Sequence, residues 1–534
     1  MGGDYDLSRA RQRSLSGEAG KPRKPKELQK SQKPQKQMTG PLVSVVIPVL
    51  HDTAELVDLL DALGPHTLSP ATDGDRICEV IVANGDEQDE SVEAVREGYP
   101  GVRWVTSPPG RARQMNAGAR LATGTWLLFL HADTVLHGEW PEELRRVGQD
   151  TRVCAGAFRF TLRSPTRTAR LVERGVGWRV RWLGLPYGDQ GLFVRRAVFE
   201  QIGGYRLLPF MEDVDLVRRL WRTGRMVALD MPIVVSARRW DRDGWLRRTV
   251  SNMLLLGLYF LGVSPWRLAG VYYSQSPSLP VVRADRPRAL PPTYVSPRVV
   301  VIVPALDEEE AIGQVLSEIP SYVASVVVVD NGSTDATADI ARGHGAVVVS
   351  EPRRGYGRAC LAGLSAVPDA DIVVFLDADR SDYPADMTAL VEPILTDEVD
   401  LVIGYRGGVG RPAWARLGTA TCVGLINRGW HACYRDLGPF RAVRRAALDR
   451  LAMSDQTYGW TIEMQVKAAE ANLRVLEVPI AQRERVGRSK ISGSVGGTVR
   501  AGKRMLATIW VLWRTRRARE PRMATDVPGV GHVE

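Results

Sequence analysis

The stretch Val299-Val300-Val301-Ile302-Val303-Pro304 and the two apolar runs after it decide the fold of this chain. The second run, 326–329, leads into Asp330-Asn331-Gly332-Ser333-Thr334-Asp335, and the third, 372–376, ends in Asp377-Ala378-Asp379. Short β-branched runs that are separated by helix-length segments are typical of buried parallel strands in β-α-β units. Ligands of such open sheets bind outside the carboxyl ends of the strands, so these polar residues predict a binding site at one sheet edge.

Asp377 and Asp379 are the first candidate metal ligands. They are two residues apart, so both side chains would project to one face if the strand continued through them. Carboxylate oxygens suit Mg²⁺ or Mn²⁺, and these ions bind substrate phosphates at their remaining positions. The pattern therefore predicts a site for a cation and a diphosphate. The alternative is that such acids only cap helices, as Ser333 and Asp335 could do.

The first half of the chain repeats this order of elements. An apolar run at 43–47 ends in Pro48, a second at 80–82 is followed by Asn84, and a third at 126–130 ends in His131-Ala132-Asp133. The spacing matches the second half except for the first gap, which the loop 64–75 lengthens. The sequence therefore predicts an internal duplication, with two α/β domains of mostly parallel sheet.

Composition limits the class of protein. At 534 residues the chain is too long for one hydrophobic core, and its five scattered cysteines indicate a reducing compartment and no disulfide framework. The formal net charge of +10 suits an anionic substrate, nucleic acid or a membrane surface. Residues 1–40 carry ten Lys or Arg against four acids and lack the apolar core of a signal peptide. We expect a cytoplasmic protein, with peripheral attachment to the inner face of the plasma membrane as a further hypothesis.

Five segments are predicted along the chain. They are a disordered basic tail at 1–40, a first domain at 41–273, a Pro-rich linker at 274–297, a second domain at 298–519 that ends in an amphipathic helix, and a disordered tail at 520–534. The apolar stretches 253–263 and 505–513 are both too short to span a bilayer as helices. The second lies between basic clusters, which suits either a helix in the headgroup layer or a helix docked on the domain.

On these residues the second half resembles family 2 glycosyltransferases of the GT-A fold, and within them the polyprenyl-phosphate sugar synthases of the dolichol-phosphate mannose synthase type. The resemblance implies that Asp377 and Asp379 hold the metal, with Asp379 also catalytic. It implies contacts to the nucleotide sugar from Pro304, Leu306, Glu308, Val329, Asp330, Asn331, Ala378 and Ser381.

Three later motifs of the second half carry the same resemblance, namely 436–441, 458–464 and 483–490. They imply that Arg441, Arg488 and Lys490 bind phosphates of donor and acceptor, and that Glu463 acts in catalysis by orienting the acceptor or nucleotide side. This half has no Glu-Asp pair to serve as a base, which is coherent because a lipid phosphate is already anionic. The alternatives are a surface salt bridge for Arg441 and a solvated helix face for Glu463.

In the first half, residues 110–118 and 129–134 resemble a bacterial glycosyltransferase subfamily linked to arsenosugar biosynthesis, in which the His-Ala-Asp triplet is normal. Alignment with Asp377 and Asp379 predicts a metal at His131 and Asp133, the resemblance implies acceptor contacts from Asp189 and Gln190, and Asp213 lies where inverting family 2 enzymes carry their general base. The donor contacts that the resemblance implies are Pro48, Leu50, Asn84, Asp86, Arg111 and Arg113. The alternatives are that Asp213 only serves the dipole of the helix 214–221, or that this half is a scaffold.

The sequence thus predicts a bifunctional, metal-dependent transferase of sugars from UDP- or GDP-linked donors. The second domain would act on a polyprenyl phosphate or similar anionic acceptor, and the first on a hydroxyl. The rival hypothesis is that one domain is active and the other is a nucleotide-binding or membrane-recruited scaffold. A dehydrogenase is disfavoured because no Gly-x-Gly-x-x-Gly turn follows the first strand of either half. Nucleic acid is disfavoured as a partner because the basic residues gather in the tails.

Overall fold

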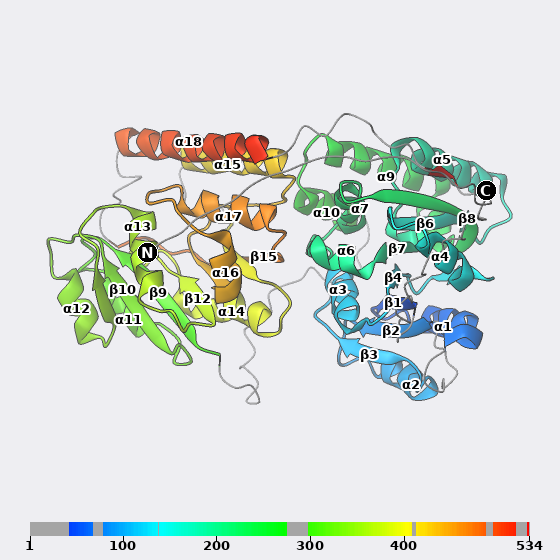
Figure 1. Cartoon of the computed structure of the whole chain (residues 1–534), viewed down its shortest axis with the longest axis horizontal. Coiled ribbons are helices and arrows are strands. Elements are labelled where there is room, and N and C mark those ends of the chain that lie inside the picture. Colours follow the sequence, from blue (N-terminus) through cyan, green and yellow to red (C-terminus); the bar gives the residue numbers. More distant parts are fainter. Residues whose placement is uncertain are drawn as a thin grey trace, which may run out of the picture. The chain divides into compact units, whose positions relative to one another are not determined.

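The computed structural model describes residues 42–67, 78–136, 138–274, 297–407, 413–486, 495–519 and 531–532. The predicted basic tail, almost all of the predicted linker and most of the predicted C-terminal tail lie outside these ranges. Figure 1 shows the elements of both halves.

The first half is built on a mixed sheet in the order β16-β8-β6-β7-β4-β1-β2-β3, with β5 paired to β8. Strands β3, β2, β1 and β4 are parallel to one another. Strand β7 is antiparallel to β4 and to β6, and β6 is parallel to β8. The strands are β1 (Val43–Val49), β2 (Cys78–Asn84), β3 (Arg103–Thr106), β4 (Trp126–Phe129), β5 (Thr134–Leu136), β6 (Val153–Leu162), β7 (Leu192–Arg195), β8 (Arg225–Val235) and β16 (Gly531–His532).

Helices connect and cover these strands. They are α1 (Thr53–Thr67), α2 (Glu90–Gly98), α3 (Arg111–Leu121), α4 (Trp140–Gly148), α5 (Arg167–Leu183), the short η1 (Gly188–Gln190), α6 (Arg196–Gln201), α7 (Glu212–Leu220), α8 (Arg238–Asp243), α9 (Trp245–Phe260) and α10 (Pro265–Ser274).

The second half has a sheet in the order β11-β10-β9-β12-β14-β13-β15. Its strands are β9 (Val299–Ala305), β10 (Ser325–Asp330), β11 (Val347–Ser350), β12 (Ile372–Phe375), β13 (Leu401–Arg406), β14 (Arg441–Arg444) and β15 (Val475–Ile480). The order and the strand directions match β3-β2-β1-β4-β7-β6-β8 of the first half. The predicted duplication of an α/β domain is confirmed.

The helices of the second half are α11 (Ile312–Ser317), α12 (Thr337–Gly343), α13 (Tyr356–Ser365), η2 (Pro384–Asp386), α14 (Met387–Leu395), α15 (Ala413–Trp430), α16 (Arg445–Leu451), α17 (Trp460–Glu470) and α18 (Val495–Arg519).

One close helix–strand contact occurs in both halves and explains a repeated glycine. A Cβ at Gly118 of α3 would lie 2.5 Å from a methyl of Val46 on β1, and a Cβ at Gly363 of α13 would lie 2.6 Å from a methyl of Ile302 on β9. Because Cβ atoms essentially never approach a neighbour so closely, any other residue would push the helix away from the sheet. The two glycines thus set how the helix before the third central strand packs.

The acidic residues lie beyond the ends of their strands. Strand β12 ends at Phe375, so Asp377 and Asp379 lie in the loop and turn that follow it. The condition that the strand continues through both aspartates is therefore not met, and strand alternation does not set their directions. The hydrogen bond from the N–H of Leu376 to the carbonyl of Ile302 is the last ladder contact before the chain turns.

The C-terminal helix α18 docks on the second domain by one side. Ile509 is buried, the Thr508 hydroxyl donates to a carboxylate oxygen of Asp455, and Arg516 donates to the carbonyl of Gly429. Its opposite side exposes Trp510 and other apolar residues. Among the described residues, no helix combines the length and the apolar character that crossing a membrane requires.

Candidate active sites

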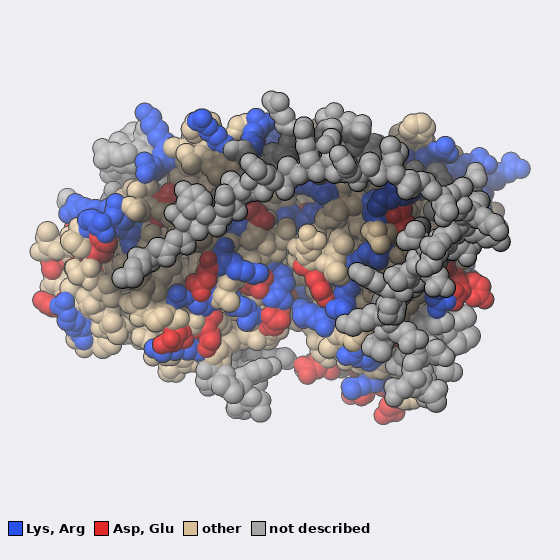
Figure 2. All heavy atoms as spheres, in the orientation of Figure 1, with Lys and Arg blue, Asp and Glu red and all other residues tan. Residues whose placement is uncertain are grey.

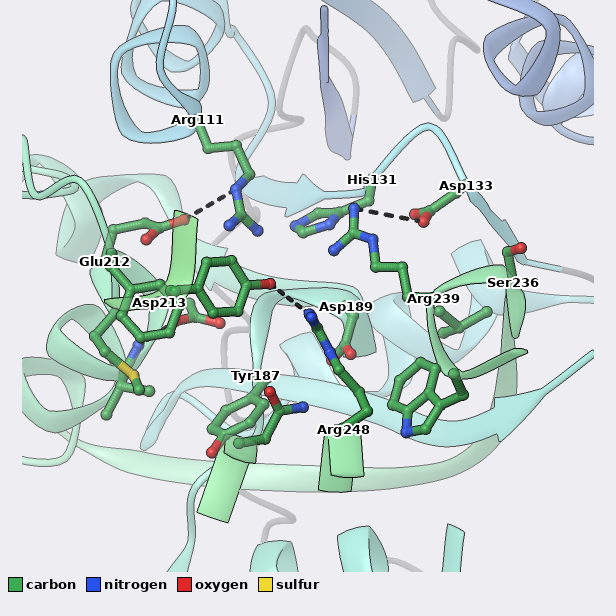
Figure 3. Close-up of a pocket in the computed structure, with 17 residues that line it drawn as sticks. Arg111, His131, Asp133, Tyr187, Asp189, Glu212, Asp213, Ser236, Arg239 and Arg248 are labelled. Atoms are coloured by element: carbon green, nitrogen blue, oxygen red, sulfur yellow. Dashed lines mark hydrogen bonds and ion pairs between the residues drawn. The ribbon is translucent and has the colours of Figure 1, made fainter. Parts of the chain in front are cut away.

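The first half contains a cavity of about 100 Å³, and Figure 3 shows the side chains that line it. Five predicted site residues line it together: Arg111, His131, Asp133, Asp189 and Asp213. They come from four separate elements along more than one hundred residues of sequence. The cavity therefore joins the residues predicted for donor, metal, acceptor and base in the first half.

The fold explains how these side chains meet. His131 and Asp133 follow the central strand β4, and Arg111 is the first residue of α3. Asp189 lies in η1, just before β7, and Asp213 lies in the first turn of α7. Because β7 pairs with β4, the segment that carries Asp189 comes next to the strand end that carries His131.

The carboxylate of Asp213 is held by two backbone N–H groups. The N–H of Gly188 donates to Oδ2 at 2.8 Å, and the N–H of Val214 donates to Oδ1 at 2.8 Å. Each carboxylate oxygen has more than one lone-pair site, so both oxygens keep capacity to accept a further proton or hydrogen bond. Asp213 thus accepts a hydrogen bond in the first turn of α7, in keeping with the alternative that it serves this helix end, and it also lines the cavity.

Asp189 is a half-buried residue of the cavity wall, and its Oδ1 atom is buried and lacks a hydrogen-bond partner within the described parts of the chain. Burial raises the pKa of Asp189 to about 6, although the guanidinium of Arg179 opposes the rise. A buried carboxylate oxygen without a partner is costly, so a ligand proton or a cation at this point would relieve it.

Its neighbour Gln190 has a structural place. The side-chain oxygen of Gln190 accepts from the N–H of Tyr187 at 3.1 Å and from Arg179 at 3.0 Å. It does not line the cavity, and its predicted acceptor contact stays a prediction.

His131 and Asp133 offer one nitrogen and one carboxylate. Burial lowers the pKa of His131, and the positive charge of Arg111 lowers it further. The imidazole is therefore neutral near pH 7 and keeps a lone pair for a metal. Asp133 lies 3.9 Å from the guanidinium of Arg239. A mixed nitrogen and oxygen pair fits Mn²⁺ better than Mg²⁺.

Arg111 is one of the cations that line the cavity. Its Nε lies 3.3 Å from a carboxylate oxygen of Glu212, and this negative charge raises the pKa of Arg111, so the guanidinium stays charged. Three further residues of the wall were missed by the sequence reasoning: Arg239 of α8, Arg248 of α9 and Tyr272 of α10. Arg248 donates to the hydroxyl of Tyr272. The one signal for them was the cluster of Arg residues at 238–248.

The remaining donor residues predicted for the first half lie elsewhere. Pro48 and Leu50 lie at the end of β1, and Asn84 and Asp86 close a tight turn after β2. In this turn the side-chain oxygen of Asn84 accepts from the N–H of Asp86 at 3.0 Å. Arg113 forms an ion pair with Glu398 at 3.0 Å and does not line the cavity. For these five residues a donor contact stays a prediction.

In the second half, the loop after β12 gathers three carboxylates. The Tyr356 hydroxyl donates to Asp377 at 3.1 Å, and the N–H of Ser381 donates to Asp379 at 3.0 Å. Burial raises the pKa of Asp377, and the charges of Asp379 and Asp382 raise it further. The pKa of Asp382 is itself raised by burial to about 6. Sequence reasoning missed Asp382, although it lies in the same loop.

An arginine that was also missed crosses this loop. Arg485 lies beyond β15, and its guanidinium is 3.1 Å from Asp379 and 2.8 Å from Glu308. It thus connects a residue predicted for the metal with one predicted for the nucleoside. The backbone of the same segment holds the loop, since the N–H of Val486 donates to the carbonyl of Asp379 at 3.1 Å.

These donors fit a metal that also binds a diphosphate. In the described parts of the chain, no three His, Cys, Asp or Glu side chains are already arranged around a metal-sized space. Mg²⁺ and Mn²⁺ commonly take one or two carboxylates and complete their shell with water and phosphate oxygens. The mutual repulsion that raises the pKa of Asp377 is what a cation would relieve.

Several residues predicted for the second site have structural contacts. The Asn331 side chain donates to the carbonyls of Glu351 and Arg353 and accepts from the N–H of Gly355, which fixes the loop before α13. Val329 has no exposed surface. Pro304, Leu306, Asp330 and Ala378 lie at or just beyond the ends of β9, β10 and β12, as predicted.

Arg441 is the clearest departure from the sequence prediction. Its side chain is 0% exposed, and the guanidinium donates to the carbonyls of Gly438 and Thr461. Burial lowers its pKa to about 10. In this arrangement Arg441 holds the backbone together, so geometry does not support its predicted phosphate contact, and it is not a surface salt bridge either.

Glu463 is also turned into the protein. Its carboxylate accepts from the N–H groups of Ser454 and Asp455 and pairs with Lys467 at 2.8 Å. The alternative of a solvated helix face is wrong for this residue, and an orienting role stays a prediction. Arg488 and Lys490 lie outside the described residues.

Comparison with known proteins decides the family. The profile of the family described as glycosyl transferase family 2 matches residues 44–211 and 300–450, which together make up more than half of the chain. The chain belongs to glycosyltransferase family 2. Both GT-A domains of this family 2 glycosyltransferase are matched, so the family resemblance predicted for each half is confirmed.

Three relatives of this glycosyltransferase are informative. An uncharacterised glycosyltransferase of Mycobacterium tuberculosis is 41% identical over 205 residues, covering 38% of this chain and 93% of the relative. A dolichyl-phosphate hexose transferase of Haloferax volcanii is 34% identical over 211 residues, covering 38% and 91%. An undecaprenyl-phosphate mannosyltransferase of Micrococcus luteus is 33% identical over 244 residues, covering 41% and 98%.

The chain is also similar to solved structures, among them glucosyl-3-phosphoglycerate synthase of Mycobacterium tuberculosis in complex with Mn²⁺, UDP and glucosyl-3-phosphoglycerate. It is 25% identical, covers 42% of this chain and 87% of that chain, and has a TM-score of 0.36.

Proposed function

We propose that this family 2 glycosyltransferase is bifunctional and uses a divalent metal in each domain. The first domain transfers a sugar from a nucleotide donor to a hydroxyl group, and the second transfers one to a polyprenyl phosphate or a similar anionic acceptor. The observation that carries the proposal is the cavity of the first domain, which joins Asp213, Asp189, His131 and Arg111 in one space. A domain kept only as a scaffold would not need such an arrangement of ionisable groups.

In the first domain Asp213 is the general base. As the acceptor hydroxyl oxygen bonds to the anomeric carbon and the bond to the nucleoside diphosphate breaks, the hydroxyl proton passes to the Asp213 carboxylate. The hydrogen bonds from Gly188 and Val214 fix this carboxylate before the acceptor arrives. Arg111 supplies positive charge for the departing diphosphate.

His131 and Asp133 would hold the cation of the first domain. When bound, Mn²⁺ would neutralise charge on the diphosphate leaving group. Asp189 lies on the acceptor side of this space, where its buried carboxylate with a raised pKa can share a hydrogen bond with an acceptor hydroxyl.

In the second domain the acceptor needs no base, because a phosphate monoester is anionic near neutral pH. Asp377 and Asp379 would hold the cation, and Arg485 lies close enough to balance charge between Asp379 and Glu308. Similarity to two polyprenyl-phosphate sugar transferases supports this acceptor class. Arg488 and Lys490 remain the predicted acceptor-phosphate ligands, and UDP- or GDP-linked sugars the predicted donors.

Product analysis of single-site variants tests the proposal. The full chain would be incubated with a panel of UDP- and GDP-sugars, Mn²⁺, a polyprenyl phosphate and hydroxyl acceptors. We expect Asp213→Asn to remove only the hydroxyl-linked product and Asp379→Asn to remove only the phosphate-linked product. If Asp379→Asn removed every product and Asp213→Asn removed none, the first domain would be a scaffold and bifunctionality would be refuted.

A further inference from the structure

The helix α9 has two faces of opposite kind. Arg248 and Asn252 line the cavity of the first domain, and Leu255 and Tyr259 continue the same face as buried residues. Spacings of four, three and four residues place all four on one side of the helix. One side of α9 is thus a wall of the proposed active site.

The other face of α9 is apolar and exposed. It consists of Leu246, Val250, Met253, Leu254 and Phe260, together with Leu261 directly after the helix, and these side chains are 47% to 81% exposed. A surface helix of a globular protein ordinarily turns its apolar stripe inward and its polar residues outward. Contiguous exposed apolar residues of this kind mark an interaction surface.

The helix α5 belongs to the same surface region. Val172 and Val176 of α5 pack in one cluster with Trp240 and with Trp245, the first residue of α9. Figure 1 draws α5, α9 and α10 along the same edge of this domain. The inward side of α5 thus packs beside the start of α9.

Arginine and tryptophan alternate on the outward face of α5. Leu171, Trp178 and Trp182 are each at least 60% exposed. Exposed basic residues accompany them along the helix, namely Arg167, Arg170, Arg174 and Arg181, of which Arg170 pairs with Glu173. Glu173 is the one acid in α5, and α9 has none. In Figure 2, basic side chains project at the edge where Figure 1 draws α5.

This composition identifies the partner. Apolar and Trp side chains among Arg residues suit the boundary between headgroups and acyl chains, where anionic lipids attract the basic residues. A second copy is a poor partner, because a two-fold contact would set the basic α5 faces against each other. The basic segment 1–40 of the same chain would be repelled in the same way.

We infer that the first domain lies on an anionic bilayer through α5 and α9, and that its acceptor hydroxyl is carried by a lipid. The helix diameter is about 10 Å, so a bilayer against the outer face of α9 lies roughly that far from Arg248 and Asn252. The acceptor half of this inference rests on the proposed function of the first domain, while the bilayer half stands without it.

Vesicle flotation of the full chain tests the bilayer contact. We expect binding to vesicles of phosphatidylcholine with one quarter phosphatidylglycerol at least ten-fold above binding to phosphatidylcholine alone. Met253→Ser with Leu254→Ser should lower this binding at least ten-fold. Val347→Ser, at an exposed apolar position of the second domain, is the control and should leave it unchanged.

Two outcomes would overturn the bilayer contact. One is binding that Met253→Ser with Leu254→Ser leaves intact and that Trp510→Ser with Val511→Ser on α18 alone removes. The other is a lowered unfolding midpoint in the α9 variant with unchanged vesicle binding, since protein would then cover the face. A fluorescent label on Leu254→Cys should shift to the blue with anionic vesicles, and one on Val347→Cys should not.

The acceptor half has its own measurement. The Asp379→Asn chain would be given tritiated UDP-glucose or GDP-mannose, Mn²⁺ and vesicles of a bacterial total lipid extract. We expect label in the lipid fraction, lost when Asp213→Asn is added. Label only in water-soluble product would overturn the lipid acceptor and leave the proposed function standing, whereas no label in any product would overturn the proposed function of the first domain.

Discussion

The backbone N–H of Gly188 donates a hydrogen bond of 2.8 Å to Oδ2 of Asp213, and this contact links the turn before β7 to the first turn of α7. The two residues are 25 positions apart in the sequence. The candidate base therefore has a fixed direction, and the turn that fixes it also carries Asp189. In the proposed mechanism, acceptor recognition and proton transfer in the first domain therefore depend on the same short segment.

Gly188→Ala should impair the proposed active site of the first domain by steric contact alone. The added Cβ would lie 3.2 Å from Nε2 of His131 and 3.5 Å from Oδ2 of Asp213. We expect the turnover number of the first domain to fall at least ten-fold, because the added methyl group would displace the side chain of His131 or Asp213 from its catalytic position. Gly98→Ala is the matched control, since its Cβ meets nothing. Equal turnover in both variants would show that the turn tolerates the change.

Two aspartates on α7 should separate chemistry from stability. Asp213→Asn removes the base, so the turnover number should fall by about 10² to 10⁴ while the unfolding midpoint changes little. Asp215 instead pairs with Arg206 at 3.0 Å and Arg219 at 2.8 Å inside the protein. Asp215→Asn should lower the free energy of unfolding by about 3 kcal/mol, because the buried Arg219 and the half-buried Arg206 both lose a charged partner. Steady-state kinetics and thermal unfolding of both variants check this. If Asp213→Asn lowered only stability and Asp215→Asn lowered only turnover, Asp213 would not be the base.

Glu463 should make stability depend on pH. Burial raises its pKa, but hydrogen bonds from Lys467, Ser454 and Asp455 outweigh burial and leave the folded-state pKa below the ordinary value. Its stabilising contribution is therefore present above the unfolded-state pKa and is lost as pH falls through the folded-state pKa. Glu463→Gln should cost about 2 kcal/mol of unfolding free energy at pH 7, and this cost should shrink as pH falls through the folded-state pKa of Glu463.

Chemical denaturation of Glu463→Gln and the parent chain in a pH series from 7 downward provides this measurement. Glu310→Gln, at an exposed position before α11, serves as the control. A difference between Glu463→Gln and the parent chain that stays the same across the whole series would mean that the ionised carboxylate contributes nothing.

The local sequence pattern was sufficient to predict the positions of the strands and of the acidic residues that follow their carboxyl ends. The apolar runs at 299–303 and 372–376 form β9 and β12 within two residues, because buried parallel strands need continuous β-branched residues. His131 and Asp133, which follow the run at 126–130, line one cavity, and their metal contact stays a prediction.

Contacts made by distant packing could not be predicted in this way. Arg239, Arg248 and Tyr272 reach the cavity because α8, α9 and α10 fold back over the first domain, and no local periodicity encodes that return. Arg441 looked like a phosphate ligand, yet it is buried on backbone carbonyls that only the folded chain brings together. Strand β12 ended before Asp377 because the chain turns there, which an alternating pattern cannot show.

The proposed bifunctional transfer requires a nucleotide-sugar site in each of the two domains. Calorimetric titration of UDP and of GDP into the full chain with Mn²⁺ measures this directly. We predict two nucleotide sites per chain in total, one lost in Asp133→Ala and the other in Asp379→Ala. A single site in the parent chain that survives Asp133→Ala and disappears in Asp379→Ala would contradict the account.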